Sequence, residues 1–325
     1  MNTRRALFRR MAVALAFLFA APAWSQDSYP GKPVTIICPF PAGGVVDVIS
    51  RIVAEKMGAS MKATFVVENR TGAGGTIGAG AVARAAPDGY TLLMGGSATH
   101  VFAPSLYKNL TYHPMKSFTP IGQISASPLV IVVGSKTQAS TLPELVDLLR
   151  KSGDKANYAS NGPGTFPQIS AELFKQANRL QTTHVPYNGG PAAVTALLQG
   201  DATMSINHIA VIQGMVKSGK LKAIATTGNE RAEAFPNLPT LGELGLKLEA
   251  NTWFGLFAPA GTPKPVIDRL SAELAAALKD EAVRARLAQS GEEVRFLPPE
   301  RFGPYVESEI GKWGTVIRDA KIAID

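Results

Sequence analysis

The sequence has few cysteines, histidines and charged residues, and each shortage excludes a class of protein. One cysteine in 325 residues excludes a disulfide framework within the chain and any multi-cysteine zinc or iron–sulfur site. Four scattered histidines show no spacing typical of a metal centre. Charged residues make up 18% and apolar residues 46%, which excludes a disordered polar chain and a charged coiled coil. The length is instead that of about two ordinary domains with buried cores.

The basic excess points towards a nucleic-acid partner until its location is considered. Lys and Arg number 33 against 25 Asp and Glu, a net charge of +8. Four of these charges, Arg4, Arg5, Arg9 and Arg10, precede an apolar run at 11–21 that is followed by small residues. This order is typical of an export signal, which we predict to span residues 1–25. Without it 29 basic residues face 25 acidic ones, or +4, with no basic stripe, so no nucleic-acid partner is expected.

The predicted signal places the mature protein in the periplasm. Its apolar run is about half of the ~20 residues needed to span a bilayer, which favours cleavage over a permanent anchor. Residues 3–8 also resemble a twin-arginine signal, and the sequence leaves that route and the general secretory route both open. No later segment is long and apolar enough to cross a membrane. Cys38 lies within an apolar run, where we expect a buried side chain.

Strand patterns alternate with helix patterns along the chain, which predicts α/β layers around largely parallel sheets. Short apolar runs predict strands at 34–38, 64–67, 91–94, 129–133, 157–160 and 183–185. Helical spacing predicts helices at 45–57, 76–85, 142–150, 166–174, 191–200, 263–279 and 301–321. Thr141 and Pro143 indicate the start of one helix, and Thr165 with Gln168 has the spacing of a capping box at another.

Two stretches, 120–133 and 251–259, separate the blocks of strand–helix units and are expected to cross between domains. We therefore predict a discontinuous domain 1 of residues 26–125 plus 255–325 and a continuous domain 2 of residues 126–254. A cleft between two such domains is the usual place for a small ligand.

Four glycine-rich loops each precede a predicted helix, at 41–44, 72–75, 161–165 and 188–190. Such a loop aims unpaired backbone N–H groups and the positive end of the helix dipole at one point, which binds an anion without Lys or Arg. In α/β sheets these loops gather at the carboxyl ends of the strands. The alternative is that glycine only permits the tight turn from strand to helix.

The motifs of nucleotide-binding and hydrolytic enzymes are absent from the sequence. Ile77 stands where a dinucleotide-binding motif needs its third glycine, and the triphosphate, nucleophile-elbow and zinc-protease motifs are not found. His184 is expected to brace a loop or lie in the core, and Tyr187 and Trp253 are candidates to face a cleft. We therefore predict no catalytic residue and no bound metal.

Several motifs in order along the chain carry a family resemblance. They are PFPAGG at 39–44 with Asp47, Asn69-Arg70 with TGAGG at 71–75, HVPYNG at 184–189 and WFGLFAPAGTP at 253–263. Over nearly the whole mature chain this pattern resembles the Bug family, the extracytoplasmic solute receptors of tripartite tricarboxylate transporters.

The resemblance implies a type II periplasmic-binding-protein fold, in which two α/β domains close on a small carboxylate that backbone amides and waters hold. It implies no chemistry and no cofactor, with membrane permease subunits as partners, and we expect the protein to be a monomer. The ligand-binding positions that it implies are Phe40, Ala42, Gly43, Asp47, Gly74, Gly75, Ser97, Thr99, Ser160, Gly164, Thr165, Tyr187 and Asn188. Phe166, which follows Thr165, is a further candidate to contact the ligand.

Departures from the family pattern bear on the ligand. Many relatives have His where this chain has Phe166-Pro167-Gln168, Asp near Thr203, and Lys at Asn188. The missing carboxylate at Thr203 favours a ligand without an ammonium group, and Phe40 and Phe166 could flank a flat ring. A dicarboxylate, either aliphatic or aromatic, is therefore preferred. An acidic amino acid, a tricarboxylate, a role as a carboxylate sensor for a signalling partner, and an exported α/β enzyme remain the alternatives.

Overall fold

The computed structural model describes residues 29–246, 248 and 250–319, so the predicted export signal at 1–25 lies outside the described residues. The strands are β1 Val34–Cys38, β2 Phe65–Asn69, β3 Thr91–Gly96, β4 Phe118–Gly134, β5 Asn157–Ser160, β6 Thr183–Pro186, β7 Met204–His208, β8 Leu221–Thr226 and β9 Asn251–Pro259. The helices are α2 Val45–Met61, α3 Thr76–Ala83, α4 Ala103–Leu106, α5 Leu142–Ser152, α6 Phe166–Ala177, α7 Gly190–Gln199, α8 Ile209–Lys217, α9 Lys264–Lys279, α10 Glu281–Gln289 and α11 Pro299–Asp319. A 3₁₀ turn at Ala73–Gly75 precedes α3, and a π-helical turn at Ser97–Phe102 follows β3.

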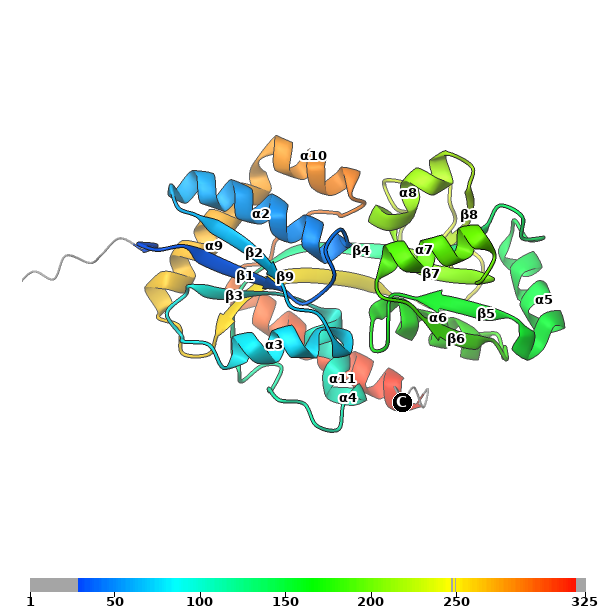
Figure 1. Cartoon of the computed structure of the whole chain (residues 1–325), viewed down its shortest axis with the longest axis horizontal. Coiled ribbons are helices and arrows are strands. Elements are labelled where there is room, and N and C mark those ends of the chain that lie inside the picture. The colour runs from blue at the N-terminus through cyan, green and yellow to red at the C-terminus, as the bar shows by residue number, and fades with distance from the viewer. Residues whose placement is uncertain (1–28, 247, 249, 320–325) are drawn as a thin grey trace, which may run out of the picture. The chain divides into compact units, whose positions relative to one another are not determined.

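Two long antiparallel strands join the two groups of strands. The order across the sheet is β2-β1-β3-β9-β4-β7-β5-β6, with β8 also paired to β4. β4 pairs with β9 along Phe118–Pro128 and then with β7 and β8 along Leu129–Gly134. Figure 1 shows β4 and β9 running side by side from one group to the other. These are the stretches 120–133 and 251–259 that the sequence assigns to the crossing.

The sheet is mixed, which corrects the prediction of largely parallel sheets. β1 lies parallel to β2 and β3, and β5 lies parallel to β6 and β7. The two crossing strands and β8 pair antiparallel. A parallel pair needs a crossover helix, and each parallel strand here is connected to its partner in that way. β4 carries the chain from the first group of strands to the second and β9 carries it back, so these two strands are antiparallel.

Most predicted elements are present with shifted ends, whereas α4, β7, α8, β8 and α10 were not predicted. The Thr141 cap is confirmed, because its hydroxyl accepts from the Glu144 amide while the Glu144 carboxylate accepts from the Thr141 amide. The capping box at Thr165 is wrong. The Gln168 side chain reaches one residue further back and accepts a 2.7 Å hydrogen bond from the Gly164 amide.

The core confirms one sequence prediction and corrects another. Cys38 is fully buried, and burial raises the pKa of its thiol to about 11, so it acts as a small apolar side chain. Trp253, a candidate for facing the cleft, is also fully buried, and it packs edge-on against Phe302 with ring centroids 5.4 Å apart. β9 carries Trp253 into the core because adjacent residues of a strand point to opposite faces.

The described residues from Lys32 onwards form one compact unit, so the proposed division at about residues 125 and 254 stays a prediction. Among the described residues, none of the helices is both long and apolar enough to span a bilayer.

Candidate functional site

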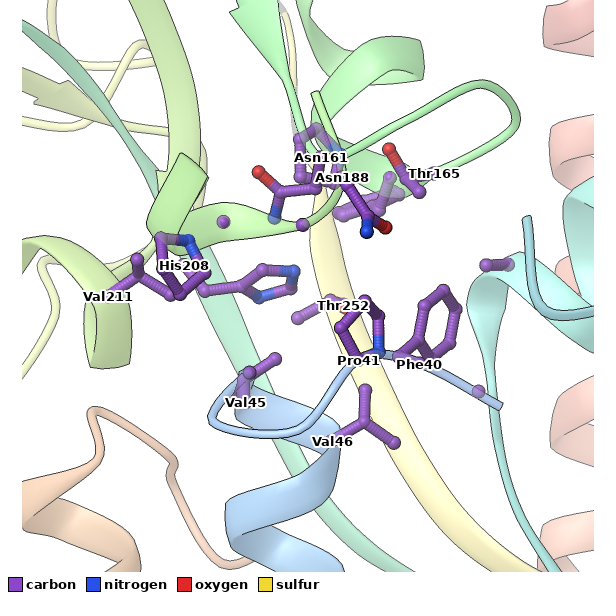
Figure 2. Close-up of a pocket in the computed structure, with 18 of the residues that line it drawn as sticks. Phe40, Pro41, Val45, Val46, Asn161, Thr165, Asn188, His208, Val211 and Thr252 are labelled. Carbon is purple, nitrogen blue, oxygen red and sulfur yellow. The ribbon is translucent and has the colours of Figure 1, made fainter. Parts of the chain in front are cut away.

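A cavity of about 250 Å³ is lined by residues of three of the four glycine loops, those at 41–44, 161–165 and 188–190. Figure 2 shows labelled side chains converging on it from several segments of the chain. Its walls are mainly apolar, with Asn161, Thr165, Asn188, His208 and Thr252 as polar exceptions. The complete lining is Phe40, Pro41, Ala42, Gly44, Val45, Val46, Gly96, Ala98, Asn161, Thr165, Phe166, Pro167, Asn188, Gly189, Gly190, Pro191, Ala192, His208, Val211, Thr252 and Phe254.

The topology explains this location. Five strands, β1, β3, β5, β6 and β7, end at the cavity, and the segment that leaves each one contributes to the walls. These are the strands that lie parallel to their neighbours, so their carboxyl ends share one edge within each group. Thr252 and Phe254 come from the crossing strand β9. Ligands of α/β proteins usually bind at the carboxyl ends of the parallel strands. Here each of the two groups of strands contributes such an edge to the cavity.

Three helices begin at the cavity wall. The first hydrogen bond of α2 runs from the Val48 amide to the Gly44 carbonyl, so the amides of Val45 and Val46 have no carbonyl to bond within the helix. The first bond of α7 runs from the Ala193 amide to the Gly189 carbonyl, which leaves Gly190 and Ala192 in the same position. The α6 start at Phe166 adds a third positive helix end.

Asp47 braces the loop before α2 and does not line the cavity. Its carboxylate accepts hydrogen bonds from the Gly43 amide (3.0 Å) and from the Asn69 side chain (2.9 Å), and pairs with Arg51 at 2.9 Å. Burial raises the pKa of this carboxyl, but Arg51, the Gly43 amide and Asn69 together outweigh burial and lower it. Asp47 is therefore ionised at neutral pH, and the Gly43 amide already has its acceptor.

A histidine network braces the loop between β5 and α6. The His184 Nε2 lies 2.6 Å from the Ser160 hydroxyl, and the Gln168 amide nitrogen lies 3.3 Å from His184 Nδ1. Since Gln168 donates to Nδ1, the ring proton belongs on Nε2, which donates to Ser160. In that tautomer His184 cannot take a proton from Ser160, so the pair does not form a nucleophile and base. The prediction that His184 braces a loop is confirmed.

His208 is the site residue that sequence reasoning missed. It ends β7 and caps the start of α8, only 7% exposed, and its ring lines the cavity. Its Nδ1 has no hydrogen-bond partner, and burial lowers the pKa of the imidazole to about 4. The turn from β7 to α8 contains no glycine, and so it lacks the signal by which the other four loops were found.

Five of the predicted site residues line the cavity: Phe40, Ala42, Thr165, Phe166 and Asn188. The other nine are not among the lining residues: Gly43, Asp47, Gly74, Gly75, Ser97, Thr99, Ser160, Gly164 and Tyr187. Several of these residues make hydrogen bonds within the protein next to the lining residues. The Ser97 hydroxyl accepts from the Trp253 amide at 3.3 Å, and the Thr99 hydroxyl lies 2.9 Å from His100 Nδ1. Their direct contact with a ligand stays a prediction.

The structure does not support two arguments about the identity of the ligand, one from Phe166 and one from Thr203. Phe166 is 3% exposed and stacks on Phe102, with ring centroids 5.1 Å apart and planes 4° from parallel, so its ring belongs to the core. Thr203 precedes β7 at the end opposite His208, where its amide donates to the Asn157 side chain. It does not line the cavity, so the residue at that position gives no information on the ligand's charge.

No Lys, Arg, Asp or Glu is among the described residues that line the cavity. Within the described part of the chain, no group of three His, Cys, Asp or Glu is placed to hold a metal ion. The polar groups of the lining residues are backbone amides, the side-chain amides of Asn161 and Asn188, the hydroxyls of Thr165 and Thr252, and the imidazole of His208. This arrangement suits the binding of a small polar anion.

Known proteins of the same fold share this architecture. Residues 49–322 match the family described as the tripartite tricarboxylate transporter family receptor. The solved structure of the periplasmic binding protein BugD is 36% identical with a TM-score of 0.87, covering 91% of this chain and 100% of that one. Rpa4515 of R. palustris with adipate is 28% identical with a TM-score of 0.88, covering 91% and 100%. MatC of Rhodopseudomonas palustris with bound malate is 33% identical with a TM-score of 0.84, covering 89% and 100%.

These similarities confirm the predicted type II periplasmic-binding-protein fold of α/β layers with a ligand cleft. The matching proteins are extracytoplasmic solute-binding receptors and not enzymes. The chain therefore belongs to the receptor family of tripartite tricarboxylate transporters, as its resemblance to the Bug family predicted.

Proposed function

We propose that this receptor captures a small carboxylate, preferably a dicarboxylate, in the cavity and delivers it to the membrane components of a tripartite tricarboxylate transporter. The observation that carries the proposal is the convergence of three helix starts on one cavity that has no lysine or arginine among its described lining residues. Helix-end amides bind a carboxylate through hydrogen bonds and the helix dipole without a counter-charge.

The size of the cavity and the ligands of two structural neighbours support a small diacid. A volume of about 250 Å³ lies just below the range of about 300–1,000 Å³ that is usual for drug-sized ligands. The neighbours described above hold adipate and malate, which both carry two carboxylates. An aromatic diacid is less favoured, because of the two phenylalanines only Phe40 remains available to contact a ring.

Closure of the predicted domains, 26–125 plus 255–325 on 126–254, would complete the site. A contact between their loops supports this step. A methyl group added at Gly74 would lie 3.0 Å from the Pro163 carbonyl and 2.7 Å from the Tyr107 hydroxyl, so the loop before α3 already touches the loop before α6. The proposed sequence is capture on the α2 and α3 loops, then closure around β4 and β9.

The proposed ligand contacts are the predicted residues that line the cavity together with those that the structure adds. The first group, without Phe166 because its ring packs in the core, is Phe40, Ala42, Thr165 and Asn188, and the second is Val45, Val46, Asn161, His208 and Thr252. The protein is proposed to act as a monomer in the periplasm after removal of residues 1–25.

The test is a thermal-shift and calorimetry panel on the mature protein with mono-, di- and tricarboxylates and acidic amino acids. A ligand that binds only the native state at 100 times its Kd stabilises that state by about 2.7 kcal/mol and raises the melting temperature. We expect dicarboxylates to give the largest rise. If no carboxylate raises the melting temperature, the receptor binds a different class of solute and the proposal is wrong. Delivery is tested by uptake of the labelled acid in cells with and without this chain.

A further inference from the structure

His208 presents an unpaired nitrogen to an apolar cavity. His208 is 7% exposed, so more than nine tenths of it is buried, and its Nδ1 has no hydrogen-bond partner. Figure 2 shows the imidazole reaching from the end of β7 into the space between the labelled residues of both strand groups. A buried polar atom without a partner costs free energy, so this unpaired nitrogen at the wall of a cavity indicates that a ligand group pairs with it.

Two further unpaired atoms belong to residues that are linked to His208 by hydrogen bonds. The Asn161 side chain donates to Asn207 Oδ1 at 3.2 Å, and that oxygen also accepts from the His208 amide at 2.9 Å. Asn161 Oδ1 and Asn207 Nδ2 are left without partners. The three residues are therefore connected by hydrogen bonds at the carboxyl ends of β5 and β7, and Asn161 and His208 line the cavity.

We propose that His208 is the specificity-determining residue for a second anionic group of the ligand, and that its imidazole takes up a proton when this group binds. The inference rests on the proposed capture of a carboxylate. The first carboxylate is held at the helix starts, whereas the second enters a region without lysine or arginine among the described lining residues. A protonated imidazole supplies the missing positive charge, and a monocarboxylate does not need it.

The imidazole is neutral in the empty cavity, because burial lowers its pKa to about 4. An anion within hydrogen-bond distance favours the protonated form and raises the pKa again. Binding of a dicarboxylate near neutral pH therefore draws one proton from solvent. By linkage, the affinity for a dicarboxylate rises as the pH falls towards the pKa of the empty site, while the affinity for a monocarboxylate changes little.

The elements around His208 bring few other titratable groups. β4, β9 and α7 contain none in their described spans, and Lys217 is at the far end of α8. On α6, Glu172 and Lys175 pair with each other. Asp47 on α2 pairs with Arg51, and Glu292, in the loop that packs on Ile209, accepts from Ser125 and Ser127. No charged group among the described residues contributes to the shift of the His208 pKa.

The experiment measures proton uptake by calorimetry at about pH 7 in two buffers of different ionisation enthalpy. The ligands are malate, adipate and monocarboxylates of matching length, and the proteins are the wild type, His208→Asn and the control His113→Asn, which changes an exposed histidine outside the cavity. We expect about one proton per dicarboxylate for the wild type and the control. His208→Asn keeps a hydrogen-bonding side chain, and we expect it to take up no proton and to lose at least tenfold of its preference for dicarboxylates.

The outcomes separate the inference from the proposed function. Dicarboxylate binding by the wild type without proton uptake overturns the role of His208 and leaves carboxylate capture intact. Equal discrimination by His208→Asn and the wild type overturns it as well. If no carboxylate binds, the proposed function falls and the inference with it. Should His208→Asn fail to fold, proton uptake by the wild type, compared between di- and monocarboxylates, decides alone.

Discussion

The carboxylate of Asp47 accepts a 3.0 Å hydrogen bond from the backbone amide of Gly43, four residues earlier in the chain. The same carboxylate binds Asn69 at the end of β2, so one buried charge ties the loop before α2 to the neighbouring strand. The sequence motif PFPAGG with Asp47 therefore encodes a braced loop. Its glycine amide faces a side chain of the protein, and the donors left for a ligand are the next amides, at Val45 and Val46.

Replacement of Asp47 by alanine is expected to loosen this loop. It leaves the Gly43 amide and the Asn69 side chain without an acceptor, which lowers the free energy of unfolding by about 1–3 kcal/mol. Carboxylate affinity should fall at least tenfold, because the α2 amides are no longer held in place. Denaturant unfolding and calorimetry measure the two effects. Asp147→Ala, which removes an exposed pair with Arg150, is the control. Unchanged affinity in Asp47→Ala would show that the loop needs no brace.

A negative charge at the rim of the cavity is expected to oppose ligand binding. Asn188 lines the cavity and is exposed, so Asn188→Asp should fold normally. Repulsion between two charges about 5 Å apart at the protein surface weakens binding of a carboxylate by roughly ten- to hundredfold. The loss should shrink as salt is added. The exposed Asn237→Asp, outside this cavity, is the control. A variant that binds carboxylates as tightly as the wild type contradicts the assignment of this cavity to an anion.

Glu292 is expected to make stability fall as the pH rises. The carboxyl is buried and accepts hydrogen bonds from Ser125 (2.7 Å) and Ser127 (3.1 Å). Burial raises its pKa to about 7, above the ordinary value of 4.5, although the two serines act in the opposite direction. Between these pH values the folded state holds a proton that the unfolded state has lost, so stability is present below pH 4.5 and decreases up to about pH 7.

Glu292→Gln should therefore be more stable than the wild type above pH 7 and similar to it near pH 4.5. The difference in unfolding free energy is at most about 3 kcal/mol, because each pKa unit corresponds to about 1.4 kcal/mol. Thermal unfolding across this pH range measures it, with the exposed Glu233→Gln as control. Because His100 and His208 titrate with the opposite sign in both proteins, their effect cancels in the comparison. Parallel curves for Glu292→Gln and the wild type would mean that the buried carboxyl is not protonated.

The sequence predicts the parts of the fold whose causes are local. Glycine and proline mark the loops before α2, α3, α6 and α7, because only a few residues permit those turns, and all four were found. The turn at His208 needs no special residue, so β7, α8 and the histidine itself were missed. The antiparallel pairing of β4 with β9 joins residues more than a hundred positions apart, which no local pattern reveals.

The family resemblance identified the loops of the site but not which atoms face the ligand. Ser97, Thr99 and Ser160 have the residue types of ligand contacts, yet their hydroxyls are bonded within the protein. The neighbours Gly96, Ala98 and Asn161 line the cavity instead. A shift of one residue along a loop exchanges the inward and outward positions, and side-chain packing of the whole molecule sets that register.

Alanine variants at three glycines with positive φ separate the cost of backbone strain from the effect of moving a residue of the ligand site. Gly43 (φ 77°) and Gly153 (φ 57°) have no atom within 4 Å of an added methyl group, whereas at Gly75 (φ 95°) the methyl would lie 2.9 Å from Thr99 Cγ2 and 3.1 Å from Phe40 Cζ. Alanine at any of them costs about 1–2 kcal/mol of stability, since the left-handed region disfavours a Cβ. Gly75→Ala must also move Phe40, a lining residue, and we expect at least a tenfold loss of carboxylate affinity. Gly43→Ala should lose less affinity, and Gly153→Ala, outside the cavity, should lose none. Calorimetry on the three variants measures this order, and equal affinity in Gly75→Ala and Gly153→Ala would remove Phe40 from the ligand site.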